Sequence, residues 1–246
     1  MALIHSFEKS GNMLFKYRGQ IPVILFLLAI PVLHFTDYTF LTEKLILVYS
    51  IISVIISLSG FLIRAYAIGT TPKGTSGRNR DEQVAESLNT TGIYSVVRHP
   101  LYLGNYLMWI GIVVFSFNIY FIIIVSLLFW IYYERIMFAE ERFLEKKFGD
   151  VYLDWSKRVH TFFPAFGKYI KSSFPFSFKS ILRREYSGLA ATAISFAFID
   201  ILRIYFITAQ IVWQRVSVYV MVATILIAII LRTLKHCHML DEEGRS

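Results

Sequence analysis

Cysteine is almost absent from this sequence of 246 residues, and charged residues are scarce. The single Cys237 excludes an internal disulfide and any metal site built from several cysteines. Only 17% of the residues are charged, whereas a soluble domain keeps about a quarter of its residues charged. The hydrophobic residues make up 56% of the chain and occur in long blocks. This pattern is typical of segments surrounded by lipid.

Other patterns are missing as well. The chain contains no G-x-G-x-x-G sequence, which a Rossmann-type nucleotide site would require. Four histidines outside the motifs do not form a convincing metal-ligand pattern, so we expect no metal centre; these four are His34, His160, His236 and His238. The formal charge of +8 would suggest nucleic-acid binding in a soluble protein. In a membrane protein it indicates basic loops beside an anionic leaflet, so we expect no nucleic-acid partner.

Six apolar segments predict an all-α, polytopic transmembrane helical bundle. They cover residues 21–35, 45–63, 102–117, 119–137, 189–209 and 216–231. The third and fourth segments are so close in sequence that they must form an antiparallel hairpin. We interpret the first as a retained span, because no convincing cleavage site follows it.

The lysines and arginines predict the orientation of the bundle. They gather before the first span, in the loop after the second, and in residues 139–185, whereas the opposite side carries only Lys44 and Arg215. Both termini and both large polar segments are therefore expected on the cytoplasmic side, in the inner membrane if the source is bacterial. Apolar residues between 143 and 159 recur at helical spacing, which predicts an interfacial amphipathic helix.

A first cluster of polar and aromatic residues precedes the third span. It reads Gly-Ile-Tyr-Ser-Val-Val-Arg-His-Pro-Leu-Tyr-Leu-Gly at residues 92–104. Pro100 suits the first turn of a helix, where its missing N–H costs nothing. The free N–H groups of that turn would suit a carboxylate. Taken alone, the cluster fits an interfacial belt of aromatic and basic residues equally well.

The second cluster is the pair Glu140-Glu141 at the end of the fourth span. Two carboxylates at a helix C-terminus oppose the helix dipole and lie beside apolar membrane, so they need a compensating cation. A bound sulfonium or ammonium group could supply this charge, and so could a neighbouring arginine or lysine.

Together the two clusters resemble the isoprenylcysteine carboxyl methyltransferase and phospholipid methyltransferase family of integral membrane enzymes. The second block continues with Phe148-Gly149, Tyr152 and Lys157-Arg158-Val159, and runs to Pro164. The resemblance covers about residues 45–164. It divides the chain into an N-terminal segment with the first span at 1–44, a methyltransferase core at 45–164 and a C-terminal extension with two further spans at 165–246.

The resemblance implies S-adenosyl-L-methionine as cofactor, bound at the cytoplasmic end of the bundle. By position in the motifs, the expected cofactor-binding residues are Asn79, Ser87, Leu88, Asn89, Tyr94, Arg98, His99, Pro100, Leu101, Tyr102, Glu140 and Glu141. The methyl acceptor would be a lipid or a lipid-anchored molecule in the bilayer.

The identity of the acceptor depends on a cation near it. The carboxyl-methylating branch has an arginine four residues before the closing glutamate, but here that position is Ile136. Arg135 lies one residue away, and Arg203 lies within the fifth span beside Asp200. These two arginines are the candidate catalytic residues, and Arg203 would suit a lipid phosphate. An internal ion pair between Asp200 and Arg203 that only holds helices together is the alternative.

The run from Leu88 to Tyr102 also resembles the bacterial branch that methylates the lipid A 1-phosphate. Other acceptors stay open, namely a prenylcysteine carboxylate or phosphatidylethanolamine. Two further classes compete with a methyltransferase. A sterol-type reductase would share a related bundle, but the glutamate pair argues against it. A membrane scaffold without activity would not need the intact Arg98-His99-Pro100 motif. The sequence predicts no oligomeric state.

Overall fold

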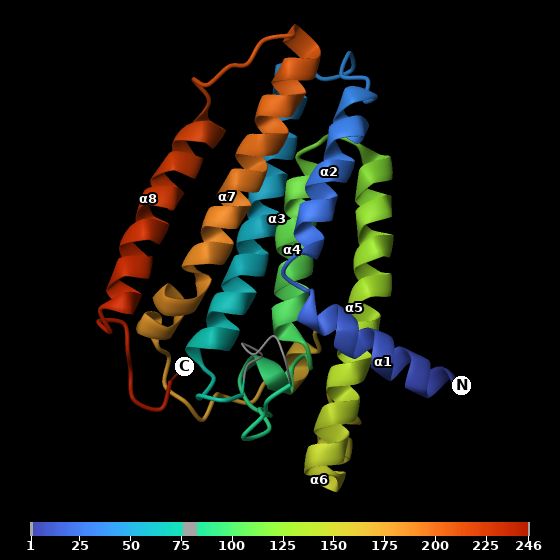
Figure 1. The fold of residues 1–246 in the computed structure, drawn as a ribbon, viewed down its shortest axis with the longest axis vertical. Helices are drawn as coiled ribbons and strands as arrows, with labels where there is room; N and C mark the ends of the chain where they lie inside the picture. Colours follow the sequence, from blue (N-terminus) through green and yellow to red (C-terminus); the bar gives the residue numbers. More distant parts are fainter. Residues whose placement is uncertain (1, 76–82, 246) are drawn as a thin grey trace.

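The computed structural model describes residues 2–75 and 83–245 of the chain, and this part folds as a bundle of helices (Figure 1). In this part no strand occurs, and only two isolated β-bridges join extended segments. The helices are α1 (Leu3–Lys16), α2 (Ile21–His34), α3 (Glu43–Gly69), α4 (Pro100–Val114), α5 (Ile119–Phe148), α6 (Asp150–Ser156), α7 (Phe178–Thr208) and α8 (Val216–His236), with short 3-10 turns η1 (Ile93–Ser95) and η2 (Phe166–Lys168).

Each of the six predicted apolar segments forms one helix, which confirms the all-α membrane bundle. Within the described residues, α3, α5, α7 and α8 are long and apolar enough to cross a membrane, while α4 is a shorter apolar helix. The 30 residues of α5 extend about 45 Å at 1.5 Å per residue, well beyond a hydrocarbon core of about 30 Å. The polar last turns of α5 therefore leave the apolar layer.

Helices α3 and α4 pack with their backbones close together. A Cβ atom added at Gly60 of α3 would lie 2.5 Å from the Gly104 carbonyl oxygen of α4, so only glycine fits there. One turn earlier in α3, Ser57 donates a hydrogen bond of 2.9 Å to the Met108 carbonyl. Small residues permit such close approach between helices in a membrane. The packing fixes α4, and therefore the motif at its start, against α3.

The amphipathic stretch after the fourth span is helical, as predicted, but it is divided. α5 continues as one helix through the glutamate pair to Phe148, and Gly149 then takes a φ of +55° before α6 begins. A positive φ favours glycine because it has no Cβ. The turn folds α6 back, so that its Tyr152 and Trp155 are buried against the end of the bundle.

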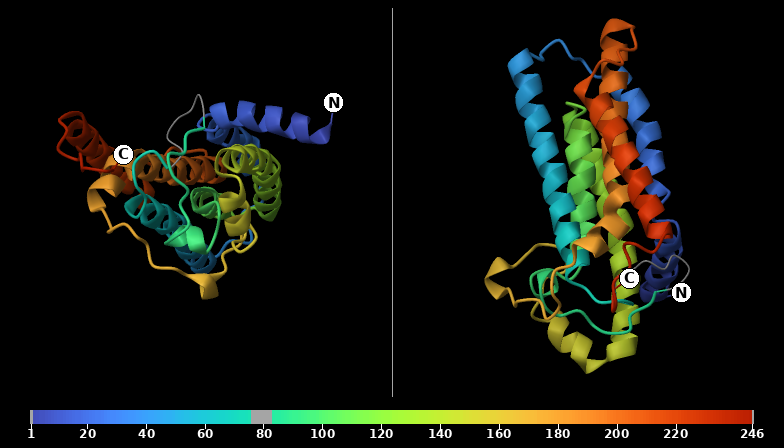
Figure 2. Two further views of the ribbon diagram at one scale, coloured as in Figure 1. Left: turned by 90° about the horizontal axis from the view of Figure 1, so that it is seen from below. Right: turned by 90° about the vertical axis from the view of Figure 1, so that its left-hand side faces the viewer.

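Helix α1 was not anticipated from the sequence. It lies across the lower end of the bundle in Figure 1 and packs against α5. Tyr132 of α5 donates to the Leu14 carbonyl at 2.8 Å, and the Phe7 and Phe138 rings meet edge to face at 5.8 Å. Both termini lie at this same end (Figures 1 and 2), as the prediction that they share one side requires.

The C-terminal tail closes the same end. Buried Arg245 donates to the carbonyls of Gly69, Thr71 and Pro175. The Lys73 N–H donates to the Gly244 carbonyl at 3.0 Å. The tail thus ties the end of α3 to the segment that precedes α7.

Candidate functional site

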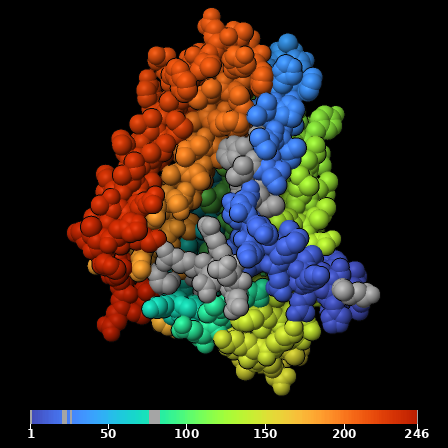
Figure 3. Space-filling model, in the orientation of Figure 1, coloured from blue at the N-terminus to red at the C-terminus, as the bar shows by residue number. Residues whose placement is uncertain are grey.

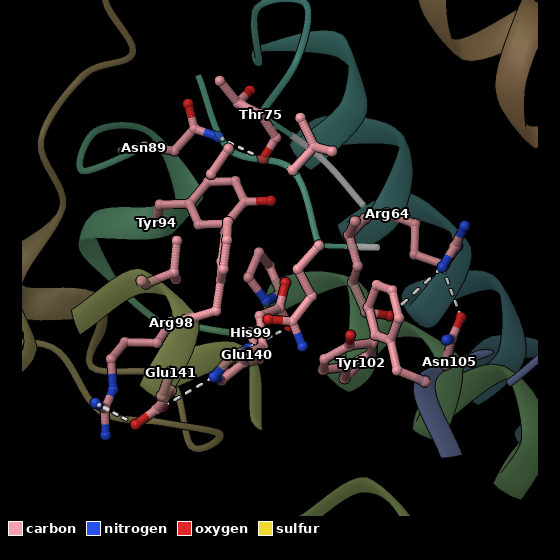
Figure 4. A pocket seen from close by; sticks show the side chains of 18 of the residues that line it. Arg64, Thr75, Asn89, Tyr94, Arg98, His99, Tyr102, Asn105, Glu140 and Glu141 are labelled. Atoms are coloured by element: carbon pink, nitrogen blue, oxygen red, sulfur yellow. Dashed lines mark hydrogen bonds and ion pairs between the residues drawn. The ribbon is translucent and has the colours of Figure 1, made fainter. Parts of the chain in front are cut away.

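A cavity of about 420 Å³ lies at the end of the bundle where α4 begins. This volume is in the usual range for small-molecule sites. The cavity is lined by eleven of the twelve predicted cofactor-binding residues, which are Ser87, Leu88, Asn89, Tyr94, Arg98, His99, Pro100, Leu101, Tyr102, Glu140 and Glu141. The twelfth, Asn79, lies outside the described residues. Figure 4 shows how the labelled side chains converge.

The Arg98-His99-Pro100 motif is held by the second sequence block. The Arg98 N–H donates to the His160 carbonyl at 2.8 Å, and the His99 N–H donates to the Thr161 carbonyl at 3.2 Å. Pro100 then begins α4. Two motifs about sixty residues apart in sequence are therefore joined through their backbones. The start of α4 lies at the cavity, where its partial positive charge favours an anionic ligand group.

His99 lies between the two glutamates. Its Nε2 is 2.9 Å from Glu141 Oε1, and its Nδ1 is 3.6 Å from Glu140 Oε2. Burial alone would disfavour the imidazolium, but the hydrogen bonds and charges of Glu140 and Glu141 outweigh this effect and raise the pKa of His99 to about 9. His99 is therefore a cation at neutral pH.

The two glutamates have different partners. Glu141 accepts from both His99 and Arg98, the latter at 3.0 Å. Within residues 2–75 and 83–245, Glu140 Oε2 is buried and has no hydrogen-bond partner at normal distance. Glu141 is thus engaged by two cations, whereas Glu140 keeps an unfilled acceptor. A buried carboxylate oxygen of this kind suits a cationic ligand.

Two other buried polar atoms beside the glutamates have capacity for a ligand. Arg98 Nε and the Tyr152 hydroxyl have no hydrogen-bond partner in the described part of the chain. Burial and the neighbouring Glu141 carboxylate raise the pKa of Tyr152, so its hydroxyl stays protonated. Burial and Glu140 likewise raise the pKa of Tyr94, whose carbonyl accepts from the Trp155 indole at 3.2 Å.

The donor set fits S-adenosyl-L-methionine. Its sulfonium and ammonium groups require an anion, which Glu140 offers, and its carboxylate requires the positive start of α4 or an arginine. Its adenine requires apolar and aromatic walls, and Tyr94, Leu144 and Trp155 line the cavity. Asn89 is held at the cavity wall by its bond to the Thr75 carbonyl at 3.4 Å.

The two arginines suggested for the acceptor are not at this cavity. Arg135 points toward α1, where it donates to Ser10 at 3.2 Å and lies 4.8 Å from the centre of the Phe7 ring. The neighbouring Ile136 is fully buried in the core. Successive helix residues point about 100° apart, which is why Arg135 and Ile136 face different sides. Arg135 therefore does not line the cavity on which the motif residues converge.

Arg203 lies near the opposite end of α7. It donates to Asp200 at 2.6 Å and to the Phe115 carbonyl at 3.3 Å. Asp200 also accepts from Arg215 and Ser217, which connects α7 to the start of α8. The pair holds helices together, as the structural alternative predicted, and Arg203 does not reach the cavity.

A different arginine lines the cavity. Arg64 of α3 donates to both carboxylate oxygens of Glu185 at 2.8 and 2.6 Å, and to Asn105 Oδ1 at 2.6 Å. Glu185 belongs to α7, in the C-terminal extension. Sequence reasoning missed this pair. The available signal was a single arginine at the end of an apolar segment, with no pattern linking it to Glu185.

The comparisons with known proteins agree with the motifs. Residues 46–151 match the family model described as phospholipid methyltransferase. A protein-S-isoprenylcysteine O-methyltransferase of Schizosaccharomyces pombe is 33% identical over 89 residues, which cover 36% of this chain and 36% of that protein. The Xenopus laevis protein of the same name is 31% identical over 116 residues, 47% of this chain and 40% of that protein.

A nickel-cobalt-cadmium resistance protein, NccN, of Alcaligenes xylosoxydans xylosoxydans is 34% identical over 89 residues, 36% of this chain and 39% of that protein. The chain thus spans about two fifths or less of the length of these curated relatives. No solved structure gives a significant match. The matched region carries the Arg98-His99-Pro100 motif and the glutamate pair, and in this region the chain is similar to phospholipid and isoprenylcysteine methyltransferases.

Proposed function

We propose that the protein is an integral membrane methyltransferase that uses S-adenosyl-L-methionine to methylate a lipid or lipid-anchored acceptor. The observation that carries the proposal is the convergence of both family motifs on one cavity, in which Glu140 keeps a buried, unfilled acceptor oxygen. The basic residues of the loops favour a cytoplasmic position for this end of the bundle and for both termini.

In this function the protein binds and orients its ligands. When bound, the cofactor supplies a methyl group that is already activated for transfer by its positive sulfonium. Glu140 balances that positive charge, and His99 holds Glu140 and Glu141 in place. Most of the rate enhancement then comes from alignment of the acceptor and from exclusion of water, because no covalent intermediate is needed.

The charges at the cavity favour an anionic acceptor. Five side chains that carry positive charge line it, namely Arg18, Arg64, Arg98, His99 and Arg184, against the three carboxylates of Glu140, Glu141 and Glu185. An ionised phosphate or carboxylate needs no general base before it attacks a methyl group, whereas an ammonium must first lose a proton. A lipid phosphate, such as the lipid A 1-phosphate, therefore fits better than an amine.

The test is transfer of a labelled methyl group. Purified protein is incubated with methyl-labelled S-adenosyl-L-methionine and a native membrane lipid extract, and the products are identified by mass spectrometry. We expect a labelled lipid that carries the methyl group on oxygen. A prenylated peptide or a labelled phosphatidylethanolamine product would reassign the acceptor. No labelled product and no cofactor binding would refute the function.

A further inference from the structure

A second cavity, of about 210 Å³, lies between α2, α4 and α7. Its walls are mainly apolar and include Leu25 and Ala29 of α2, Ile112 of α4, and Ala191 and Ile199 of α7. We call it the α7 groove. Two hydroxyl residues also line it, but Thr192 and Ser195 donate to the carbonyls of Gly188 and Ala191 in their own helix. Such satisfied hydroxyls leave a surface suited to a hydrocarbon chain.

The α7 groove joins the cofactor cavity. Arg64, Asn105 and Trp109 line both spaces. The groove therefore ends at a cationic side chain on the edge of the site at which methyl transfer is proposed. In the structure Glu185 and Asn105 accept hydrogen bonds from Arg64. An incoming anionic headgroup would compete with Glu185 for the guanidinium group of Arg64.

The size and position of the groove match one lipid tail. On α7 its lining runs from Gly188 to Ile199, which is about 16 Å at 1.5 Å per residue. That is about half of a hydrocarbon core of about 30 Å, the share of one leaflet. The groove reaches the surface at Ala191, which is exposed. In Figure 3 a hollow separates orange α7 from the blue segment, with green and teal elements at its floor.

We propose that the α7 groove holds an acyl chain of the methyl acceptor, a lipid whose anionic headgroup binds at Arg64. This inference rests on the proposed function, because it assigns the acceptor of that site. It gives the C-terminal extension, which lies outside the matched family core, the role of an acceptor-binding wall.

Photo-crosslinking tests the groove without measuring methyl transfer. The probe is phosphatidic acid with a diazirine in one acyl chain, added to the full chain in detergent micelles, and labelled peptides are mapped by mass spectrometry. We expect labelling of the α7 residues between Gly188 and Ile199. Label spread evenly over the lipid-facing surfaces of α3 and α8 would overturn the proposal.

Two variants and one control sharpen the test. Ala191→Phe places a ring in the groove, whereas Ile194→Phe adds a ring on the same helix at a residue that does not line the groove and is 41% exposed. Gly188→Leu is the second groove variant, since a Cβ there meets only Glu185 Oε2, at 3.7 Å. We expect both groove variants to reduce labelling about tenfold because methylene groups lose burial. Equal labelling in Ala191→Phe, Gly188→Leu and Ile194→Phe would overturn the proposal.

The headgroup and the proposed function are tested separately. A diacylglycerol probe with the same diazirine chain has no anionic group, so we expect it to label the groove less than phosphatidic acid does. Equal labelling by both probes would overturn the role of Arg64. Groove labelling by phosphatidic acid without any methyl transfer would refute the proposed function alone. Methyl transfer to a lipid without groove labelling would refute this inference alone.

Discussion

His99 should make the stability of the protein depend on pH in a defined direction. Its ordinary pKa is 6.5, and in the folded protein the glutamate pair raises the pKa to about 9 despite burial. The folded state therefore holds this proton more tightly than the unfolded state does. The stabilising contribution is complete below pH 6.5 and is lost as the pH rises through 9. The difference between the ordinary and the folded-state pKa of His99 corresponds to about 3 kcal/mol in the free energy of unfolding.

The measurement is equilibrium unfolding in mixed micelles between pH 6 and pH 9.5, for the wild type and for His99→Gln. Glutamine can still donate a hydrogen bond to Glu141 but does not titrate. Groups that do not contact His99 titrate equally in both proteins, so the difference between the two curves reports on His99 and its glutamate partners. We expect the wild type to lose about 3 kcal/mol more than the variant over this range. Parallel curves, or a wild type that gains stability with rising pH, would refute the assignment of a bridging imidazolium.

Three further predictions follow from the contacts. Glu141→Gln should lower the free energy of unfolding by about 1–3 kcal/mol, because two cations lose a charged acceptor; unchanged unfolding would show that the ion pairs contribute nothing. Arg203→Leu should lower the free energy of unfolding by about 3 kcal/mol. Neither Arg203→Leu nor Arg135→Ala should alter cofactor affinity in a binding titration. A tenfold loss of affinity in either variant would show that the arginine contributes to the cofactor site. Arg245→Ala should weaken cofactor binding, since the tail holds the backbone that leads to Thr75 in the cavity wall; equal affinity in wild type and variant would show that the tail has no such effect.

The parts that the sequence predicts well are those encoded by local pattern. Apolar blocks identify the membrane helices, since each block is continuous. The motif around His99 and the glutamate pair are compact strings, and the short connection between α4 and α5 brings them together at one end of a hairpin. That geometry explains why the residues from Arg98 to Tyr102 share one cavity with Glu140 and Glu141.

The parts that the sequence does not predict depend on contacts between distant segments. Arg64 and Glu185 are 121 residues apart; Arg64 is a lone charge at the end of an apolar segment, whereas Glu185 follows Arg183 and Arg184. Arg135 and Ile136 are neighbours on α5, yet Arg135 faces α1 and Ile136 lies in the core. A difference of one position along the helix therefore decides which side a residue faces. The sequence also does not predict that α5 is one long helix, because the change from apolar to amphipathic composition resembles a helix boundary. In the structure the helix continues through that change to Gly149.

The central claim is that this cavity binds S-adenosyl-L-methionine through Glu140, and an equilibrium binding titration of Glu140→Gln tests it most directly. The matched control is Glu145→Gln on the same helix, where Glu145 accepts from Arg142 and does not line the cavity. A lost charged interaction of about 1.5–3 kcal/mol predicts a Kd raised about tenfold to hundredfold in Glu140→Gln. The control should bind as the wild type does. Absence of saturable binding in the wild type, or equal affinity in the wild type and Glu140→Gln, would contradict the claim.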